Sequence, residues 1–505
     1  MVPLKVGTPG QFAELREGLR SLGYSEDAVC QRTGSKTIYE FKDLKEGRPT
    51  GPEVNDALDA LIRLLMDEVT VEESVLLANL PARLLELLSE LDVVRRKGDS
   101  GWKATVLLYP VAGLYVVSDR TNLVGEDLPE DLVYAAITEN TGRFLSIQPK
   151  DPGEDFLDIC CGTGIAGLLA ATRGAKRVYA ADLGARSVHY SNFNAKLNGL
   201  EQVVGVQGDL FGAVDGLQFD CIVAHPPYVP DGKKHMLFRD GGEDGEQIFR
   251  RIVEDLPKYL KPGGRLYCVT TATDREGEKL EERIRKWLGA SSGEFDVLLV
   301  ATEIGKRPSV VLEAVVKAKG KLGELGPRSE LFERLKVTAL FYGTVVIERV
   351  EQPRRVATAR CMKAETVWGE AVEWVRGWEK LAIQPSMPAA LKRTRPHLAP
   401  EMELEVVHKP GPNGLEPARY RLRAKYPFVF TANAEAWLAV LVGECNGQKT
   451  TGEIFDELRA QDVVGPGVTF EHFCAVMHSL ISNGFVELDQ FPLPRREAPV
   501  EELVH

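Results

Sequence analysis

Cysteine is scarce and unpatterned in this 505-residue sequence. Its eight cysteines form no C-x-x-C pair, and no histidine stands at metal-ligand spacing from them. We therefore expect reduced thiols, as in a cytoplasmic protein, and no metal site. The first ten residues lack the basic-then-apolar pattern of a secretion signal, and no apolar run approaches membrane length. These absences disfavour a secreted disulfide scaffold and a membrane protein.

An excess of basic residues is missing as well. Lysine and arginine number 62 against 74 aspartates and glutamates, which gives a formal net charge of -12. This balance argues against a protein that binds nucleic acid by broad phosphate neutralisation, although a local basic patch remains open. The hydrophobic share of 44% and the charged share of 27% are those of a globular chain. Its length suggests two to four domains.

The most informative stretch alternates apolar strands with helices and places special residues where strands end. One predicted strand leads into the turn Cys160–Gly164, and a helix follows from Ile165. A second strand ends at Asp182, Asp209 follows a third strand, Val203–Gln207, and the run His225-Pro226-Pro227-Tyr228 follows a fourth that ends at Ala224. In a doubly wound parallel sheet, ligands bind at the carboxyl ends of the strands. The pattern therefore predicts such a sheet with one ligand site.

The turn favours a nucleoside ligand without phosphates. Gly162 and Gly164 allow a tight turn and let backbone N–H groups approach a ligand at a helix N-terminus. Gly162, Gly164 and Gly167 follow the G-x-G-x-x-G spacing, but the turn holds no lysine or arginine for a pyrophosphate. Asp182 can accept from two ribose hydroxyls, Asp209 from an adenine amine and Asp158 from an ammonium group. S-adenosylmethionine carries all three of these groups.

Taken in order, these residues resemble the class I methyltransferases. The chain is most similar to the small-domain branch with Asn-Pro-Pro-Tyr after the fourth strand, which includes release-factor glutamine and RNA base N-methyltransferases. The resemblance covers roughly residues 135–350 and implies an α/β, Rossmann-like doubly wound sheet that binds S-adenosylmethionine; a sheet that binds another nucleotide is the alternative. The matching residues are Asp158, Gly162, Gly164, Asp182, Asn194, Asn198-Gly199, Asp209, Pro226-Pro227-Tyr228, Arg239-Asp240-Gly241-Gly242, Gly245, Arg250-Arg251 and Leu260–Gly264.

The resemblance also implies roles for individual residues. In the family, the side chain before the two prolines and the next backbone carbonyl hold the hydrogens of the target nitrogen, and the tyrosine stacks on its planar group. The catalytic residues implied here are His225, Pro226, Pro227 and Tyr228. The implied cofactor contacts are Asp158, Cys160, Gly162, Gly164, Asp182, Leu183, Asp209 and Leu210, with Thr141 and Arg143 from a segment that folds over the cofactor, unless that segment is a solvated loop.

One position departs from the family pattern. His225 stands where asparagine or aspartate is usual. A neutral imidazole accepts one hydrogen bond through the nitrogen that lacks the proton, and it can also act as a base because it titrates near neutral pH. The site therefore still suits a planar nitrogen, but the substrate does not transfer from the family. The alternative is a structural histidine in an altered or inactive enzyme.

Accessory domains are predicted on both sides of the methyltransferase-like region at 135–350. Residues 1–134 predict a mainly helical domain with a winged-helix-like hairpin, either for substrate capture or for packing. Residues 351–400 predict a helical linker. Residues 401–505 predict a winged-helix-like domain, similar in pattern to modules that hold a peptide, with dimerisation or capping as the alternative. A homodimer therefore stays open.

These features predict an S-adenosylmethionine-dependent N-methyltransferase that acts on a planar nitrogen of a protein or peptide. An RNA base fits the Pro-Pro-Tyr motif equally well, and Arg354, Arg355 and Arg360 offer a local basic patch for it. A small-metabolite methyltransferase and a cofactor-binding module without turnover also stay open. DNA is disfavoured, because the candidate recognition helix 470–483 contains no lysine or arginine.

Overall fold

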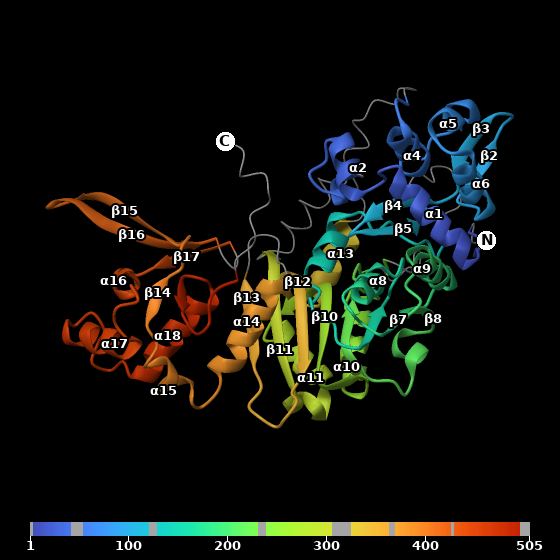
Figure 1. Cartoon of the computed structure of the whole chain (residues 1–505). Helices are drawn as coiled ribbons and strands as arrows, with labels where there is room; N and C mark the ends of the chain where they lie inside the picture. The colour runs from blue at the N-terminus through green and yellow to red at the C-terminus, as the bar shows by residue number, and fades with distance from the viewer. Residues whose placement is uncertain are drawn as a thin grey trace. The chain divides into compact units, whose positions relative to one another are not determined.

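The computed structural model divides into two compact units, which Figure 1 draws with their helices and strands labelled. The first unit comprises Met1–Ala272 with Ile284–Gly289, and the second comprises Thr273–Arg283 with Ala290–His505. Within the part that is described, no helix is both long and apolar enough to cross a membrane. The structure describes residues 4–41, 54–120, 129–230, 239–305, 325–362, 369–425 and 429–494.

Five parallel strands form the centre of the first unit. The central strands are largely buried apolar runs, as expected for a sheet covered on both faces, whereas the edge strand buries only Val203 among its five residues. Ile159 pairs with both Ala181 and Ala224, so the carboxyl ends of three neighbouring strands lie level. The predicted doubly wound sheet is confirmed. The strand order is β10-β9-β6-β7-β8, with β6 at Asp155–Ile159, β7 at Arg177–Asp182, β8 at Val203–Gln207, β9 at Phe219–Ala224 and β10 at Leu260–Arg275.

The strand order reverses between β6 and β9. From β6 the chain passes through helix α8 (Ile165–Thr172) to β7 and through α9 (Ala185–Asn198) to β8, and then it returns to the other side of β6 as β9. Helix α10 (Gln247–Tyr259) connects β9 to β10. Such a switch point opens a crevice at the carboxyl ends of the two central strands. The residues that follow β6 and β9 are Cys160 and His225.

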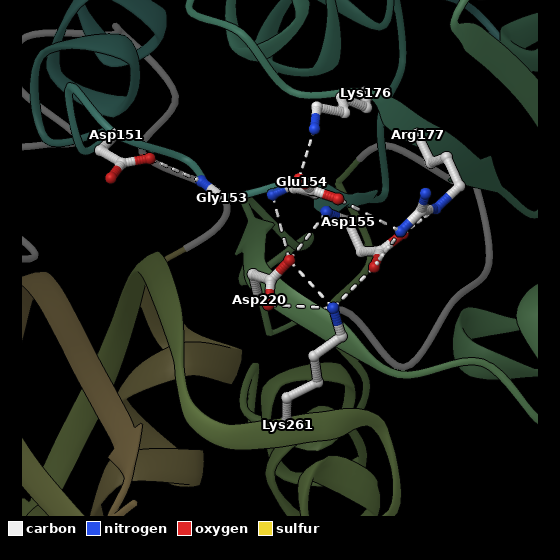
Figure 2. Close-up of polar contacts among 8 residues, drawn as sticks. All are labelled: Asp151, Gly153, Glu154, Asp155, Lys176, Arg177, Asp220 and Lys261. Carbon is white, nitrogen blue, oxygen red and sulfur yellow. Dashed lines mark hydrogen bonds and ion pairs between the residues drawn. The ribbon is translucent and has the colours of Figure 1, made fainter.

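A charged network ties the amino ends of the same strands together. Figure 2 shows the Lys261 Nζ between two carboxylates, 2.6 Å from Asp155 and 2.9 Å from Asp220. Asp220 also accepts the backbone N–H groups of Glu154 and Asp155, at 3.1 and 2.9 Å. Gly153 makes this approach possible, because a Cβ there would lie 2.4 Å from the Asp220 Cβ. The network fixes the start of β6 at the end opposite the crevice.

The N-terminal part of the first unit is mainly helical, as predicted. Its chain turns at Thr105, whose hydroxyl donates to the Val93 carbonyl at 3.1 Å. Two separate hairpins result. The elements are α1 (Pro9–Ser21), α2 (Glu26–Thr33), η1 (Ile38–Glu40), α4 (Ala57–Leu65), α5 (Glu73–Asn79), α6 (Ala82–Glu90), the sheet β1-β3-β2 (Val71–Glu72, Gly101–Ala104, Val94–Lys97) and the hairpin β4-β5 (Leu107–Val111, Leu114–Ser118).

Two asparagines of α9 dock the hairpin β4-β5 onto the parallel-sheet region. Asn194 accepts the Val117 N–H at 2.8 Å and donates to the Val117 carbonyl at 3.1 Å. Asn198 makes the same pair of bonds with Tyr115, at 2.9 and 2.7 Å. The Asn194 amide also donates to the Thr163 carbonyl in the glycine turn, at 2.9 Å. Because residues four apart share one helix face, the two amides take the place of a neighbouring strand.

The second unit contains an antiparallel edge hairpin with a third strand beside it. Strands β11 (Phe295–Gly305) and β12 (Val337–Arg349) pair antiparallel, and β13 (Thr358–Met362) pairs parallel with β11. The predicted basic patch is wrong for two of its members. Arg354 pairs with Asp296 at 3.0 Å, and Arg360 pairs with Asp274 at 2.6 Å and with Glu281. Acidic neighbours distant in sequence neutralise them.

The C-terminal region differs in detail from the predicted winged helix, which is not confirmed. A three-stranded sheet, β15-β16-β17, precedes the helices of this region. Residues 351–400 contain two strands as well as helices. The elements are α14 (Gly369–Ala382), α15 (Met387–Leu391), β14 (Pro396–Leu398), β15 (Glu403–Gly411), β16 (Gly414–Ala424), β17 (Phe430–Ala434), α16 (Ala436–Glu444), α17 (Thr451–Ala460), α18 (Phe470–Ser482) and β18 (Val486–Leu488), which pairs with β14.

Candidate active site

The glycine turn after β6 uses left-handed backbone at three residues. The φ angles are 59° at Cys160, 53° at Gly162 and 75° at Gly164. A Cβ at Gly164 would lie 2.7 Å from the Ser191 Cβ of α9, so this glycine is required for packing. A Cβ at Gly162 would meet no described atom within 4 Å. Gly162 therefore leaves open space on the outer face of the turn, where a ligand can approach the backbone.

Asp182 holds the turn from the end of β7. Its Oδ2 accepts the Gly162 N–H at 3.0 Å, and its Oδ1 accepts the Gly184 N–H at 2.9 Å. Burial raises the pKa of this carboxyl, while the two N–H groups oppose that change. Each carboxylate oxygen has a second lone pair. Asp182 can therefore shape the turn and still accept bonds from a ligand.

Three carboxylates gather around the Cys160 thiol. Burial is the main cause that raises the pKa of this thiol, and the negative charges of Asp182, Asp158 and Asp209 raise it further. Asp158 is 2% exposed and accepts the Gly167 N–H at 3.2 Å. Burial, with a smaller contribution from Asp182, raises its pKa to about 8. Such a site is short of positive charge, which a cationic ligand supplies.

The residues that follow β8 are arranged differently from Asp182. Asp209 precedes the short helix η2 (Leu210–Val214), and its Oδ2 accepts from Arg251 of α10 at 2.7 Å. Arg251 matched the family pattern without an assigned role, and this bond gives it one. Leu210 is buried with a φ of 51°, whereas Leu183 is 54% exposed. Both leucines directly follow the carboxylates in the sequence, and their role toward the cofactor stays a prediction.

His225 begins the motif after β9, beside the glycine turn. The residue as a whole is of intermediate exposure, but its Nε2 atom is buried and has no hydrogen-bond partner among the described residues. Burial lowers the pKa of His225 to about 4. The ring is therefore neutral at pH 7. Its neighbours are two aromatic rings, with centroids 5.3 Å away at Phe144 and 5.9 Å away at Tyr228.

The backbone of Tyr228 is clamped by a glycine-rich segment. The Val229 N–H donates to the Arg239 carbonyl at 3.1 Å, and the Gly241 N–H donates to the Val229 carbonyl at 3.0 Å. A Cβ at Gly241 would lie 2.8 Å from the Tyr228 Cα, and one at Gly245 would lie 2.6 Å from the Tyr228 carbonyl oxygen. These glycines therefore let the segment close against the motif. Within the motif, Pro226 is buried and Pro227 is partly exposed.

The segment before β6 is a helix rather than the solvated loop that was the alternative. Helix α7 (Glu139–Ser146) begins at Thr138, whose side chain accepts from the Thr141 N–H. The Thr141 hydroxyl lies 3.1 Å from the Thr138 hydroxyl, and Arg143 pairs with Glu139 at 2.6 Å. Both predicted cofactor contacts thus bond within their own helix, and their role toward the cofactor stays a prediction.

Sequence reasoning missed two other residues of α7. Phe144 packs on the His225 ring, and the Asn140 amide donates to the Tyr228 hydroxyl at 3.3 Å. Both residues adjoin Thr141 and Arg143, so the sequence did indicate this segment. A helix has several faces, however, and sequence spacing alone did not show which face contacts the His225–Tyr228 motif. Residues 231–238, which follow the motif, lie outside the described residues.

The residues present fit S-adenosylmethionine. Open space at Gly162 admits a ligand to the turn, and the carboxylates of Asp158, Asp182 and Asp209 suit a cation with ribose hydroxyls and an exocyclic amine. Among the described residues, no three histidine, cysteine, aspartate or glutamate side chains are placed to hold a metal ion.

Comparison with known proteins agrees with this chemistry. Residues 135–298 match the family model described as the methyltransferase small domain. A relative in Methanocaldococcus jannaschii that carries the name protein N5-glutamine methyltransferase is 33% identical over 135 residues, 26% of this chain and 68% of that protein. The release factor glutamine methyltransferase of Thermodesulfovibrio yellowstonii is 31% identical over 130 residues, 23% of this chain. The ribosomal RNA small subunit methyltransferase C of Chromohalobacter salexigens is 30% identical over 227 residues, 43% of this chain.

The chain spans 47% of the length of the release-factor relative and 62% of that of the ribosomal RNA relative. The shared part is the one that builds the parallel sheet, the glycine turn and the carboxylates at the strand ends. The parallel sheet, the glycine turn and these relatives together show that the chain belongs to the methyltransferase small domain family of class I S-adenosylmethionine-dependent methyltransferases.

Proposed function

We propose that this methyltransferase transfers a methyl group to a planar nitrogen in a protein or peptide side chain, in the cytoplasm. The observation that carries the proposal is the buried Nε2 of His225, which lacks a partner among the described residues and lies beside the Tyr228 ring. A buried acceptor without a donor costs free energy, and an N–H group of a bound substrate would satisfy it.

The neutral state of His225 supports a nitrogen acceptor. With a pKa of about 4 the ring has one acceptor nitrogen at pH 7, so it can take a single N–H bond from the target. The Pro226 carbonyl supplies a second acceptor, and Tyr228 supplies a ring for a planar group. The same His225 nitrogen is available for the proton that the target gives up. Positioning and exclusion of water would then provide most of the rate enhancement.

Cofactor binding in this proposal rests on the carboxylates. Asp182 would hold the ribose hydroxyls, Asp209 the adenine amine and Asp158 the ammonium group, while Gly162 keeps the turn open. When bound, S-adenosylmethionine supplies an electrophilic methyl group on a sulfonium centre.

A protein acceptor is favoured by two of the relatives, which carry the names protein N5-glutamine methyltransferase and release factor glutamine methyltransferase. An amide nitrogen is planar and carries N–H groups, as the site requires. The ribosomal RNA methyltransferase among the relatives supports an RNA base as the second candidate. The identity shared with each is about one third, and the His225 position departs from the motif of this branch.

A labelling experiment separates the candidates. A lysate of source cells that lack this protein is incubated with the purified full chain and S-adenosylmethionine carrying a radioactive methyl group. The products are divided between protease, ribonuclease and filtration by size. We expect macromolecular label that protease releases and ribonuclease does not.

Each other outcome contradicts the proposal in a different way. Label released by ribonuclease identifies an RNA acceptor, and label that passes the filter untreated identifies a metabolite. Absence of label despite cofactor binding identifies an inactive module. As a matched control, His225→Phe removes the acceptor nitrogen but keeps a flat ring, and it is expected to retain cofactor binding while incorporation falls about 100-fold or more.

A further inference from the structure

The C-terminal sheet concentrates positive charge on one face. Between residues 396 and 494 the chain has seven lysines and arginines against thirteen aspartates and glutamates. Four of the seven lie in the run Arg419–Lys425, at every second position. Successive side chains of a strand point to opposite faces, so the three arginines of strand β16 share one face. Lys425 is one residue past the strand and joins this face because it shares Glu403 with Arg423. An acidic region thus gathers most of its basic residues in one row.

The row lies on the solvent side of the sheet. Strand β16 buries Leu422 and Ala424, which alternate with the arginines, so the opposite face packs inward. Arg423 and Lys425 have side chains 56% and 58% exposed. Figure 1 draws β15 and β16 as a long hairpin, with β17 beside part of it.

Strand pairing defines the rest of this surface, which we call the basic sheet face. On β15, Glu403 and Glu405 stand opposite Arg423 and Arg421, and Val407 stands opposite Arg419. On β17, Thr431 and Asn433 stand opposite the same two arginines. The basic sheet face consists of Glu403, Glu405, Val407, Arg419, Arg421, Arg423, Lys425, Thr431 and Asn433.

Two glutamates neutralise only part of the row. Arg421 lies 3.3 Å from Glu405, and Glu403 is shared between Arg423 at 3.8 Å and Lys425 at 3.6 Å. Exposed pairs of this kind are weak, so a stronger anion can displace them. Within the described residues Arg419 has no ion pair. Four positive charges against two negative charges leave the face net positive.

We propose that the basic sheet face binds the phosphate backbone of single-stranded RNA. Arginine presents several N–H donors in a planar fork that matches phosphate oxygens, and neutral Thr431 and Asn433 are side-chain types that also bind phosphates. The face offers one apolar residue, Val407, whereas a protein interface needs an apolar core. The row from Arg419 to Lys425 extends about 20 Å, because a strand rises about 3.3 Å per residue. This length suits a linear polyanion rather than a single phosphate.

Binding to a fluorescent twelve-residue oligouridylate tests the proposal on the full chain. We expect the Arg419→Gln, Arg421→Gln, Arg423→Gln triple variant to bind at least about tenfold more weakly at low salt. For four phosphate contacts, the logarithm of affinity should fall against the logarithm of salt with a slope of about -3, and the variant should retain a slope of about -1. A control triple variant, Arg20→Gln, Lys258→Gln and Arg459→Gln, lowers the net charge equally and should bind as the natural chain does.

A second variant guards against loss of folding. Replacing both acidic neighbours, Glu403→Gln with Glu405→Gln, should tighten oligouridylate binding about threefold, because the arginines lose their competitors. Unfolding cannot produce that gain. The proposal is overturned if oligouridylate does not bind, if the two triple variants weaken equally, or if poly-glutamate of equal charge binds more tightly than the RNA. None of these results depends on which molecule accepts the methyl group.

Discussion

At the residue scale, Asp182 holds the backbone of the glycine turn, and we propose that it also binds the cofactor. We expect Asp182→Ala to weaken S-adenosylmethionine binding at least about 100-fold, because bonds to a charged acceptor contribute about 1.5–3 kcal/mol each. Calorimetric titration of the full chain measures this. Asp215→Ala is the control, since that aspartate contacts Tyr259 at 3.2 Å and lies away from the turn. Unchanged affinity in the Asp182 variant would refute the assignment.

His225 makes a prediction about pH. Its folded-state pKa of about 4 lies below the ordinary value of 6.5, so the unfolded chain binds the proton more readily. The neutral ring therefore favours folding above pH 6.5, and this advantage is lost as the pH falls through 4. Relative to His225→Asn, the natural chain should lose up to about 3 kcal/mol of unfolding free energy between pH 7 and pH 4.

Urea unfolding of both proteins at several pH values measures this difference, with His408→Asn as an exposed-histidine control. The same shift predicts that His225 sets no acid limb in methyl transfer above about pH 5. A limb near pH 6.5 that disappears in the Asn variant would show that the ring is solvated and our assignment wrong.

At the element scale, the docking of β5 on α9 depends on side-chain amides. Asn194 is fully buried, and its loss leaves a Val117 N–H and two carbonyl groups without partners. We expect Asn194→Ala to destabilise the chain by about 3 kcal/mol, since each buried orphan costs about 1–3 kcal/mol. Asn198→Ala should cost less, because that amide is only partly buried. Denaturant midpoints measure both, and equal costs would contradict the strand-substitute role.

At the scale of the whole molecule, the first 134 residues pack against the region that binds the cofactor. Phe12 meets Phe193 edge to face at 5.0 Å, and Arg16 donates to the Leu197 carbonyl at 2.8 Å. The sequence predicted residues 135–350 as the region that binds S-adenosylmethionine. The packing also predicts that a chain starting at residue 135 is insoluble or fails to bind, because α9 exposes its apolar face.

Supplying residues 1–134 as a separate chain in the same cells should restore solubility and binding, which calorimetry measures. A soluble fragment 135–350 that binds with unchanged affinity would refute this prediction. The division at residue 134 itself stays a prediction, as does the division at residue 350.

The sequence by itself determined the class of sheet, the glycine turn and the order of the carboxylates. These features are local, because strand ends and turn residues are set by neighbours a few positions apart. Asp158, Asp182 and His225 were predicted at strand ends, and the parallel register brings those ends together. The cofactor followed from the same residues.

Only the tertiary structure decided which residues distant in sequence contact one another. Asn194 matched a family pattern, but its partner Val117 lies 77 residues earlier. The sequence indicated Arg360 as part of a basic patch, but Asp274, 86 residues away in sequence, lies beside it and pairs with it. The charge state of His225 depends on burial by distant segments, which no local pattern encodes. Pairing, neutralisation and burial arise from non-local contacts, so they were beyond reach of the sequence alone.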